Sequence, residues 1–195
     1  MKILVACEFS GIVRDAFRKR GHDAWSCDII PCDGDNNYHY QCDVLKILDE
    51  GWDMMIAHPP CTYLSNAGAV HLYPKGMLNL ERYEKGLIAK DFFVKLLNAP
   101  IEKICIENPI PSKIYCLPDY TQTIQPWEHG HPYSKKTCLW LKNLEPLQST
   151  EIVPSDQVQS TKIAGNWFNK GGKDRQKNRA KTFTGIANAM ADQWG

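Results

Sequence analysis

The first residues that could do chemistry form the sequence His58-Pro59-Pro60-Cys61, which directly follows a short apolar stretch. Two consecutive prolines restrict the backbone, so the side chain after them is held in a fixed position. A thiol presented in this way can act as a covalent nucleophile when a neighbouring group lowers its pKa or accepts its proton. An inert cysteine in a rigid loop is the alternative. We favour the nucleophile, because thiols held so firmly are uncommon outside functional sites.

A second candidate is Glu107, in the sequence Glu107-Asn108-Pro109 after another apolar stretch. A carboxyl group in a cleft can protonate a ring nitrogen or form a hydrogen bond with it, particularly where partial burial raises its pKa. On its own, a glutamate before a turn is usually a solvated strand end. Paired with Cys61, it places an acid beside a nucleophile, which indicates chemistry on an unsaturated ring.

A third candidate is the loop Phe9-Ser10-Gly11, between an apolar stretch and a helical pattern. Such a loop offers backbone N–H groups to a nucleotide-like ligand, but its single glycine falls short of the G-x-G-x-x-G fingerprint. An ordinary strand–helix turn is equally consistent with it. Asp28 strengthens the ligand interpretation, because an acidic residue about 20 positions on can accept hydrogen bonds from a ribose. Asp43 could meet an adenine edge or be a surface-turn aspartate.

Strands and helices must bring these residues together. Apolar, β-branched runs predict strands, and apolar side chains at helical spacing predict helices. The predicted strands are Lys2–Cys7, Asp23–Ile30, Asp53–Ala57 and Lys103–Glu107, and the predicted helices are Ile12–Arg20 and Leu78–Leu97. Their alternation predicts a doubly wound α/β fold, which binds ligands at the carboxyl ends of its strands. We therefore expect the Phe9 loop, Asp28, Cys61 and Glu107 to line one cleft.

The last third of the sequence has a weaker pattern. It predicts two strands, Thr121–Gln125 and Thr137–Leu141, and a closing helix, Ala180–Trp194. His129 and His131, between the two strands, could be general bases or simple loop residues.

Between these elements, residues 142–178 have little periodicity and merge into a basic stretch. Its six positively charged side chains are Lys170, Lys173, Arg175, Lys177, Arg179 and Lys181. With Trp167 and Phe168 beside them, these charges suit phosphates and stacked bases. A charge run alone is more often a solvated loop, so this interpretation depends on the site predicted upstream.

Composition limits the class of protein. The chain has 195 residues, 43% of them hydrophobic and 23% charged, which is typical of one globular domain. Its net charge of +1 excludes an overall basic field, so contact with nucleic acid needs a local patch. No apolar run is long enough to span a membrane. Met1–Val13 starts like a signal peptide, but Glu8 interrupts the apolar run and no cleavage site follows, so we expect a cytoplasmic protein.

Eight cysteines without an export signal predict free thiols rather than disulfides. Most occupy positions typical of strands, where a thiol packs as a small hydrophobe. Cys27, Cys32, His39 and Cys42 lie close in sequence, and they could be arranged around a metal. Their spacing matches no common zinc pattern, so we do not favour a metal site.

Three motifs occur in the order found in cytosine carbon-5 DNA methyltransferases: Phe9-Ser10-Gly11, Pro60-Cys61 and Glu107-Asn108. That family shares an F-x-G-x-G-G loop, a Pro-Cys nucleophile and a Glu-Asn dipeptide. The longer strings HPPCTYLSNAG, HPYSKKTCLWL and TFTGIANAMADQWG resemble small, phage-type members, and the likeness extends over nearly the whole chain. It implies a Rossmann-like, S-adenosylmethionine-dependent methyltransferase fold in a single domain, residues 1–195, in the host cytoplasm if a phage encodes it.

The resemblance also implies a reaction. The Cys61 thiolate would attack carbon 6 of cytosine in DNA while Glu107 stabilises the protonated ring nitrogen 3. Carbon 5 would then take the methyl group of S-adenosylmethionine, after the base has been flipped out of any duplex. The implied cofactor-binding positions are Cys7, Glu8, Phe9, Ser10, Gly11, Asp28, Ile29, Asp43, Val44, Pro60, Gly185 and Asn188. The substrate-binding candidates are Asn108, Lys173, Arg175 and Arg179.

The sequence departs from the family at several points. Val13 and Arg14 stand where the loop has its second and third glycines, and Pro109 replaces the usual valine after Glu-Asn. The family's Q-x-R-x-R arginines have no clear counterpart, although two arginines of the basic stretch are candidates by chemistry. A short basic insert, residues 142–179, stands in place of a large target-recognition domain. We therefore expect single-stranded or weakly specific DNA binding, or a protein partner that recognises the target.

Three other functions stay open. The same chemistry could act on RNA or on a free cytosine nucleotide. An amino-group (N4 or N6) DNA methyltransferase has an Asp-Pro-Pro-Tyr loop, which His58-Pro59-Pro60-Cys61 matches poorly at both ends, and it has no need of Glu107. A catalytically silent protein could retain the fold and bind nucleic acid or a partner.

Overall fold

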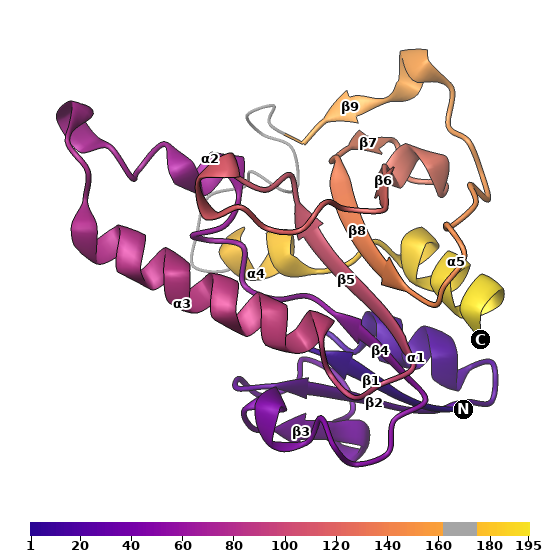
Figure 1. Ribbon diagram of the computed structural model, residues 1–195. Coiled ribbons are helices and arrows are strands. Elements are labelled where there is room, and N and C mark those ends of the chain that lie inside the picture. Colours follow the sequence, from indigo (N-terminus) through magenta and orange to yellow (C-terminus); the bar gives the residue numbers. More distant parts are fainter. Residues whose placement is uncertain (162–174) are drawn as a thin grey trace.

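Seven strands form the central sheet of the computed structural model, which describes residues 1–161 and 175–195 (Figure 1). The strand order is β3-β2-β1-β4-β5-β8-β6. The strands are β1 Lys2–Ala6, β2 Asp23–Asp28, β3 His39–Gln41, β4 Met54–Ala57, β5 Lys103–Pro109, β6 Gln122–Ile124 and β8 Thr137–Lys142. β7 (Tyr133–Ser134) and β9 (Gln159–Ser160) form a separate parallel pair. The chain winds outward from β1 in both directions, which confirms the predicted doubly wound, Rossmann-like α/β fold.

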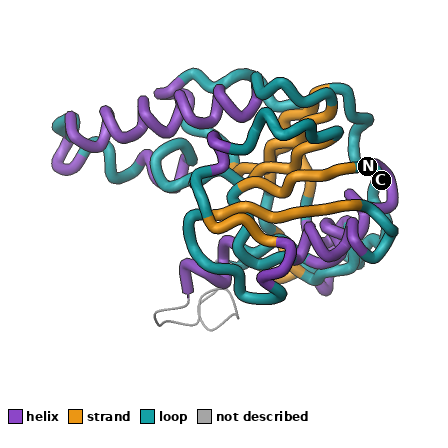
Figure 2. Tube along the Cα trace, turned by 90° about the horizontal axis from the view of Figure 1, so that it is seen from below, coloured by secondary structure: helices purple, strands orange, loops and turns teal. Residues whose placement is uncertain are grey.

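Helices cover both faces of this sheet. The long helix α3 (Leu80–Leu97) lies on one face, and α1 (Ile12–Arg18) and α5 (Thr184–Trp194) lie on the other (Figure 2). Two shorter helices are α2 (Asn66–Ala69) and α4 (Arg175–Ala180). Within the described residues, no helix combines the length and the apolar character needed to cross a membrane.

Strand β1 shows how the sequence builds the two cores. Ile3 and Val5 belong to the core formed with α1 and α5, whereas Leu4 and Ala6 belong to the core formed with α3. Successive side chains of a strand point to opposite faces, and both faces are covered here. A central strand must therefore be apolar throughout, and this is the pattern that made β1, β4 and β5 predictable.

Strand β8 is antiparallel to both of its neighbours, and it brings a further segment to the edge where the parallel strands end. It pairs antiparallel with β5, with Thr137 opposite Pro109, and antiparallel with β6. β1 to β5 are mutually parallel where they pair. Because β8 runs in the opposite direction, the residues just before it lie at the edge where β5 ends. Residues 131–136 therefore join the carboxyl ends of the parallel strands.

Some elements differ from the sequence prediction. The helix predicted to start at Leu78 begins at Leu80, because the Asn79 side chain accepts a hydrogen bond from the backbone N–H of Arg82 at 3.0 Å and caps the helix. The closing helix predicted over Ala180–Trp194 begins at Thr184; Ala180 ends the separate helix α4, and residues 181–183 connect the two. β3 lies in a turn-rich region where no strand was predicted. Its three residues are too few to show a period.

Candidate active site

Glu107 and His58 form a close pair at the carboxyl edge of the sheet. His58 follows β4 directly, Glu107 lies in β5, and these two strands are neighbours. Nδ1 of His58 lies 2.8 Å from Oε2 of Glu107, and the two side chains are 8% and 17% exposed. Burial alone would raise the pKa of Glu107, but the hydrogen bond and charge of His58, together with Lys135 and Thr137, hold that pKa below its usual value. Glu107 is therefore a carboxylate, and the rise in pKa that burial alone would cause does not occur.

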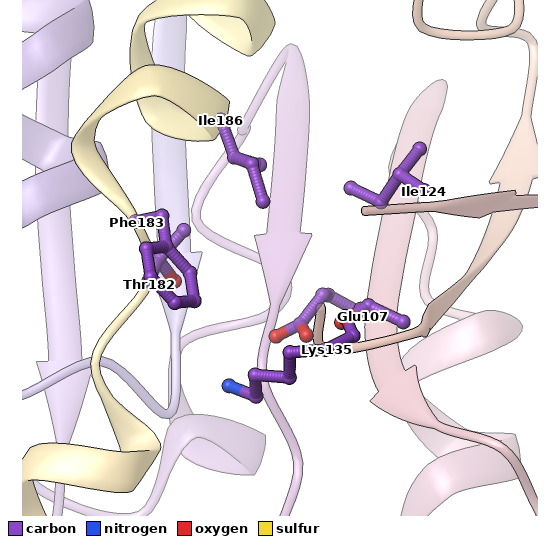
Figure 3. A pocket seen from close by; sticks show the side chains of 7 residues that line it. Glu107, Ile124, Lys135, Thr182, Phe183 and Ile186 are labelled. Atoms are coloured by element: carbon purple, nitrogen blue, oxygen red, sulfur yellow. The ribbon is translucent and has the colours of Figure 1, made fainter. Parts of the chain in front are cut away.

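Lys135 completes the surroundings of Glu107. Both residues line a small pocket, together with Ile124, Thr137, Thr182, Phe183 and Ile186 (Figure 3). The figure shows the Glu107 carboxylate and the Lys135 side chain pointing into the space in front of Phe183. The sequence analysis missed Lys135. Its signal was its place in the string HPYSKKTCLWL, directly before an apolar strand.

Cys61 shares this site. Its thiol is partly buried, and burial followed by the Glu107 charge raises its pKa, whereas Lys135 and Arg179 act to lower it. The structure therefore places four groups within electrostatic reach of one another: a thiol, a carboxylate and two cations. The Glu107 charge acts on the Cys61 thiol, whereas their predicted roles as a catalytic pair stay a prediction. The thiol itself is mostly protonated at neutral pH, and its nucleophilic form depends on the nearby positive charges.

Asn108 fixes the loop that carries Cys61. Its side-chain Nδ2 donates to the carbonyl of Pro59 at 2.8 Å, and the residue is 3% exposed. Two neighbouring residues of β5 thus hold two neighbouring residues of the loop. Glu107 contacts His58, and Asn108 contacts Pro59. This bond positions Cys61, whereas the predicted contact between Asn108 and substrate stays a prediction.

The loop after β1 is organised by Glu8. Its buried carboxylate accepts hydrogen bonds from the backbone N–H groups of Val13 at 2.7 Å and Arg14 at 3.3 Å, and from the Ser10 hydroxyl at 3.2 Å. It therefore takes the first free N–H groups of α1, which a bound anion would otherwise use. Burial raises the pKa of Glu8 against the effect of these bonds. Glu8 shapes this loop as a structural anchor.

Arg14 is buried against the loop after β1. The residue is 0% exposed, and its Nη1 donates to the Ser26 hydroxyl at 3.1 Å and to the Asp35 carbonyl at 2.9 Å. Its Nη2 is buried without a hydrogen-bond partner among the described residues. Gly11 has φ +72°, and a Cβ there would lie 2.4 Å from this Nη2. The guanidinium therefore packs directly against the glycine of the loop, which needs glycine for its conformation and for this contact.

Cys7, Asp28 and Asp43 come together beside the loop. Burial, then the charges of Asp28 and Asp43, raise the pKa of Cys7 to about 12, so both carboxylates lie near this thiol. Cys7 itself has a left-handed φ of 57°, a conformation that a non-glycine residue adopts only under constraint. Next to Asp28, the Ile29 side chain is 74% exposed. Two carboxylates and an apolar surface thus converge at the ends of β2 and β3.

The sequence was compared with protein-family models, curated proteins and solved structures. No protein-family model matches the sequence, and no curated protein matches it. A solved structure of an Escherichia coli prophage protein, described as a candidate DNA modification methyltransferase, is 14% identical and superposes with a TM-score of 0.46. The match covers 78% of this chain and 51% of that one, so the chain spans about half the length of that structure. Similarity at this level does not establish a shared function.

Gly185 and Asn188, which the resemblance assigned to the cofactor, lie in α5. The Gly185 N–H donates to Nε2 of His131 at 2.9 Å, and a Cβ on Gly185 would collide with the carbonyl of His129. Nδ1 of His129 lies 3.2 Å from the Thr150 hydroxyl, and the residue is buried. The two histidines therefore hold α5 in place, which favours the loop interpretation over general bases. Asn188 is exposed, and its role in cofactor binding stays a prediction.

The basic stretch is described only from residue 175 onward. Lys173 lies outside the described residues, and Arg175 begins α4. Lys177 and Lys181 both form ion pairs with Asp33, in the loop after β2, and Lys177 also lies 5.4 Å from the centre of the Phe9 ring. The end of the predicted loop is thus a helix packed against the Phe9 loop, because Asp33 neutralises two of its cations.

The four residues considered for zinc have different partners. The Cys27 and Cys42 sulfurs lie 3.8 Å apart, Cys32 accepts a hydrogen bond from Arg14, and His39 lies 2.9 Å from the Ser26 hydroxyl. In the part of the chain that the structure describes, no group of three or more His, Cys, Asp or Glu side chains is arranged to hold a metal ion.

Proposed function

We propose that this chain is a methyltransferase that uses S-adenosylmethionine to methylate carbon 5 of cytosine in DNA through a covalent adduct with Cys61. The observation that carries the proposal is the meeting of Cys61, Glu107 and Lys135 at the carboxyl edge of a doubly wound sheet. A thiol can add to an unsaturated ring carbon, and a hydrogen-bonding carboxyl group beside it can accommodate the charge that this addition creates.

The roles of the residues follow from the chemistry of cytosine. The ring carbon to be methylated is a poor nucleophile until addition of a thiolate at carbon 6 disrupts the aromatic system. Cys61 forms that sulfur–carbon bond, and Glu107 faces ring nitrogen 3, where the displaced electron pair arrives. Lys135 stabilises the Cys61 thiolate and offsets the charge of Glu107. Once carbon 5 has taken the methyl group, a base removes the proton from carbon 5, the carbon 5–carbon 6 double bond re-forms and the Cys61 thiolate leaves.

The residues beside this site fit S-adenosylmethionine. Asp28 and Asp43 suit the hydroxyl and amino groups of a nucleoside, and the exposed side chain of Ile29 suits its base. The orphaned Nη2 of Arg14 beside Gly11 suits a carboxylate, the terminal group of the amino-acid part. When bound, the cofactor supplies a methyl group activated by a sulfonium centre. Pro60, exposed between His58 and Cys61, would border the point of transfer.

We propose DNA as the substrate because two cations, Lys135 and Arg179, act on Cys61 at this edge and a basic stretch of the sequence leads up to Arg179. Arg179 acts electrostatically on Cys61, and the stretch from 170 to 181 continues this positive charge. The short insert leaves little surface for reading bases. We therefore expect weak sequence specificity or a preference for single strands, unless a protein partner supplies recognition.

Trapping of the adduct tests this proposal. The protein is incubated with S-adenosylmethionine and single-stranded DNA that carries 5-fluorocytosine, whose carbon 5 has no proton to lose. We expect a denaturation-resistant complex with the wild type and none with Cys61→Ser. Cys116→Ser serves as the control, because Cys116 is the exposed thiol away from the site.

The other outcomes distinguish the rival functions. Methyl transfer without an adduct would support an amino-group methyltransferase. An adduct with RNA or a free nucleotide that carries 5-fluorocytosine, but not with DNA, would show that the same reaction acts on that substrate instead. Absence of both adduct and methyl transfer with every nucleic acid would contradict the proposal and favour a binding protein.

A further inference from the structure

His58 is under the influence of two carboxylates, those of Glu8 and Glu107. It follows β4, while Glu8 follows β1 and Glu107 lies in β5, the strands on either side of β4. Its Nδ1 lies 2.8 Å from Glu107, and its Nε2 is buried without a hydrogen-bond partner among the described residues. The imidazole is thus removed from solvent and directed at Glu107 on one side.

The charges around His58 favour a protonated ring. Burial lowers its pKa, but the hydrogen bond and charge of Glu107 and the charge of Glu8 raise it by more, and Lys135 opposes them. These three charged groups come from the loop after β1, from β5 and from the segment before β8. The net result is a raised pKa, and the pair is an imidazolium beside a carboxylate.

This arrangement creates a requirement for the proposed reaction. A carboxylate only accepts hydrogen bonds, and the free ring nitrogen 3 of cytosine is also an acceptor. Two acceptors facing each other would repel, so a proton must enter between them during the attack. The proton on Nδ1 of His58 is already in a hydrogen bond to Glu107.

We propose that His58 is a positioning residue that stores the proton which Glu107 delivers to ring nitrogen 3 of cytosine. This inference rests on the proposed function. As the sulfur–carbon 6 bond forms, the electron pair of the carbon 5–carbon 6 double bond shifts to carbons 4 and 5, and that of carbon 4–nitrogen 3 shifts to the nitrogen. Nitrogen 3 takes a proton from Glu107, Glu107 takes one from His58, and His58 becomes neutral. The proton returns by the same path when Cys61 is expelled.

The first test measures the pair without any reaction. In protein labelled with nitrogen-15 at histidine, NMR signals of His58 across a pH series report the charge of its ring. We expect the wild-type ring to remain an imidazolium well above pH 6.5, its ordinary pKa, and to lose its proton at lower pH in Glu107→Gln. A neutral His58 ring in the wild type at pH 7 would overturn the proposal.

The second test measures methyl transfer against pH in His58→Gln, with His71→Gln as the matched control because His71 is exposed and distant from the pair. At pH 7 we expect kcat to fall by about 100-fold or more with little change in the KM for DNA. Lower pH reduces the Cys61 thiolate in both proteins, so the comparison is the rate of the variant divided by that of the wild type at the same pH. This ratio should recover as the pH falls, since Glu107 then takes its proton from solvent. A purely structural loss would lower the rate equally at every pH and would overturn the proposal. His58→Asn, which is smaller, checks that the result does not reflect crowding.

The two proposals fail differently. If the wild type methylates no nucleic acid, the proposed function and this inference both fall. If the wild type methylates cytosine and His58→Gln keeps the wild-type rate and pH profile, only the role of His58 falls.

Discussion

Lys135 donates from Nζ to the backbone carbonyl of Arg179 at 3.2 Å, which ties the segment before β8 to the end of α4. The same Nζ lies 5.8 Å from the centre of the Phe183 ring, at the wall of the Glu107 pocket. One cation thus contacts the helix of the basic stretch and acts on both Cys61 and Glu107. Lys135 is the residue that couples the two halves of the site.

Lys135→Met should make Cys61 less reactive. Lys135 lowers the pKa of Cys61 against the effect of burial, so its removal raises that pKa and reduces the thiolate fraction at pH 8. We expect the rate of iodoacetamide alkylation at Cys61, followed by peptide mass spectrometry, to fall by about threefold to tenfold. In both proteins the rate should rise with pH, because the thiolate is the reactive form. Lys136→Met, at an exposed neighbour, should leave it unchanged. Equal rates in all three proteins would remove Lys135 from the site.

Arg14→Lys should weaken binding of S-adenosylmethionine selectively. The lysine keeps the charge but loses the Nη2 that lies beside Gly11. We expect calorimetry to show about a tenfold loss of affinity for S-adenosylmethionine. Affinity for 5′-methylthioadenosine, which carries the nucleoside without the amino-acid carboxylate, should change little. Arg18→Lys, on the same helix, is the control. A similar loss for both ligands would show that Arg14 supports the fold alone.

Asp33→Asn should loosen the contact between α4 and the loop after β2. Lys177 and Lys181 hold the pKa of Asp33 below its usual value despite the burial that would raise it. A lowered acid pKa stabilises the fold above the unfolded-state pKa, and this contribution is lost as the pH falls through the lower folded value. We expect denaturant unfolding at pH 7 to give the variant a free energy of unfolding about 0.5–1 kcal/mol below that of the wild type. This difference should shrink below pH 4. A deficit independent of pH would point to another cause.

Gly86→Ala should destabilise the protein although alanine favours helices. Gly86 lies in α3, and a Cβ there would come within 2.1 Å of the buried Tyr115 ring and hydroxyl. Alanine gains about 1 kcal/mol in helix propensity, and the overpacking costs about 1–3 kcal/mol. We therefore expect a lower Tm, while Glu84→Ala, at an exposed position of the same helix, should keep or raise it. A Tm gain for Gly86→Ala would show that Tyr115 can move aside.

The sheet and the pairing of Cys61 with Glu107 could be predicted because they depend on local patterns. Buried strands are apolar throughout, and the carboxyl ends of parallel strands meet at one edge. Lys135 could not be found in this way, since its position depends on the antiparallel pairing of β8 with β5. No pattern in the sequence sets that pairing.

The state of Glu107 shows a second limit. Burial alone would raise the pKa of Glu107, but the shift has the opposite sign because His58 faces it from the next strand, a contact that no local pattern in the sequence reveals. Arg14 shows the same limit. The sequence indicated only that an arginine stands where the resembled family has a glycine, whereas the structure shows its guanidinium packed against Gly11.

The double ion pair at Asp33 also sets how the protein would respond to ionic strength. A lysine already neutralised by a carboxylate displaces few condensed counterions when DNA arrives, and Lys177 and Lys181 are in this state. Two lysines held in this way lower the magnitude of the slope of log K against log salt by roughly 2, compared with the same two lysines meeting phosphates from a free state. Asp33 thus lowers the affinity for a polyanion in dilute buffer and makes that affinity less sensitive to added salt.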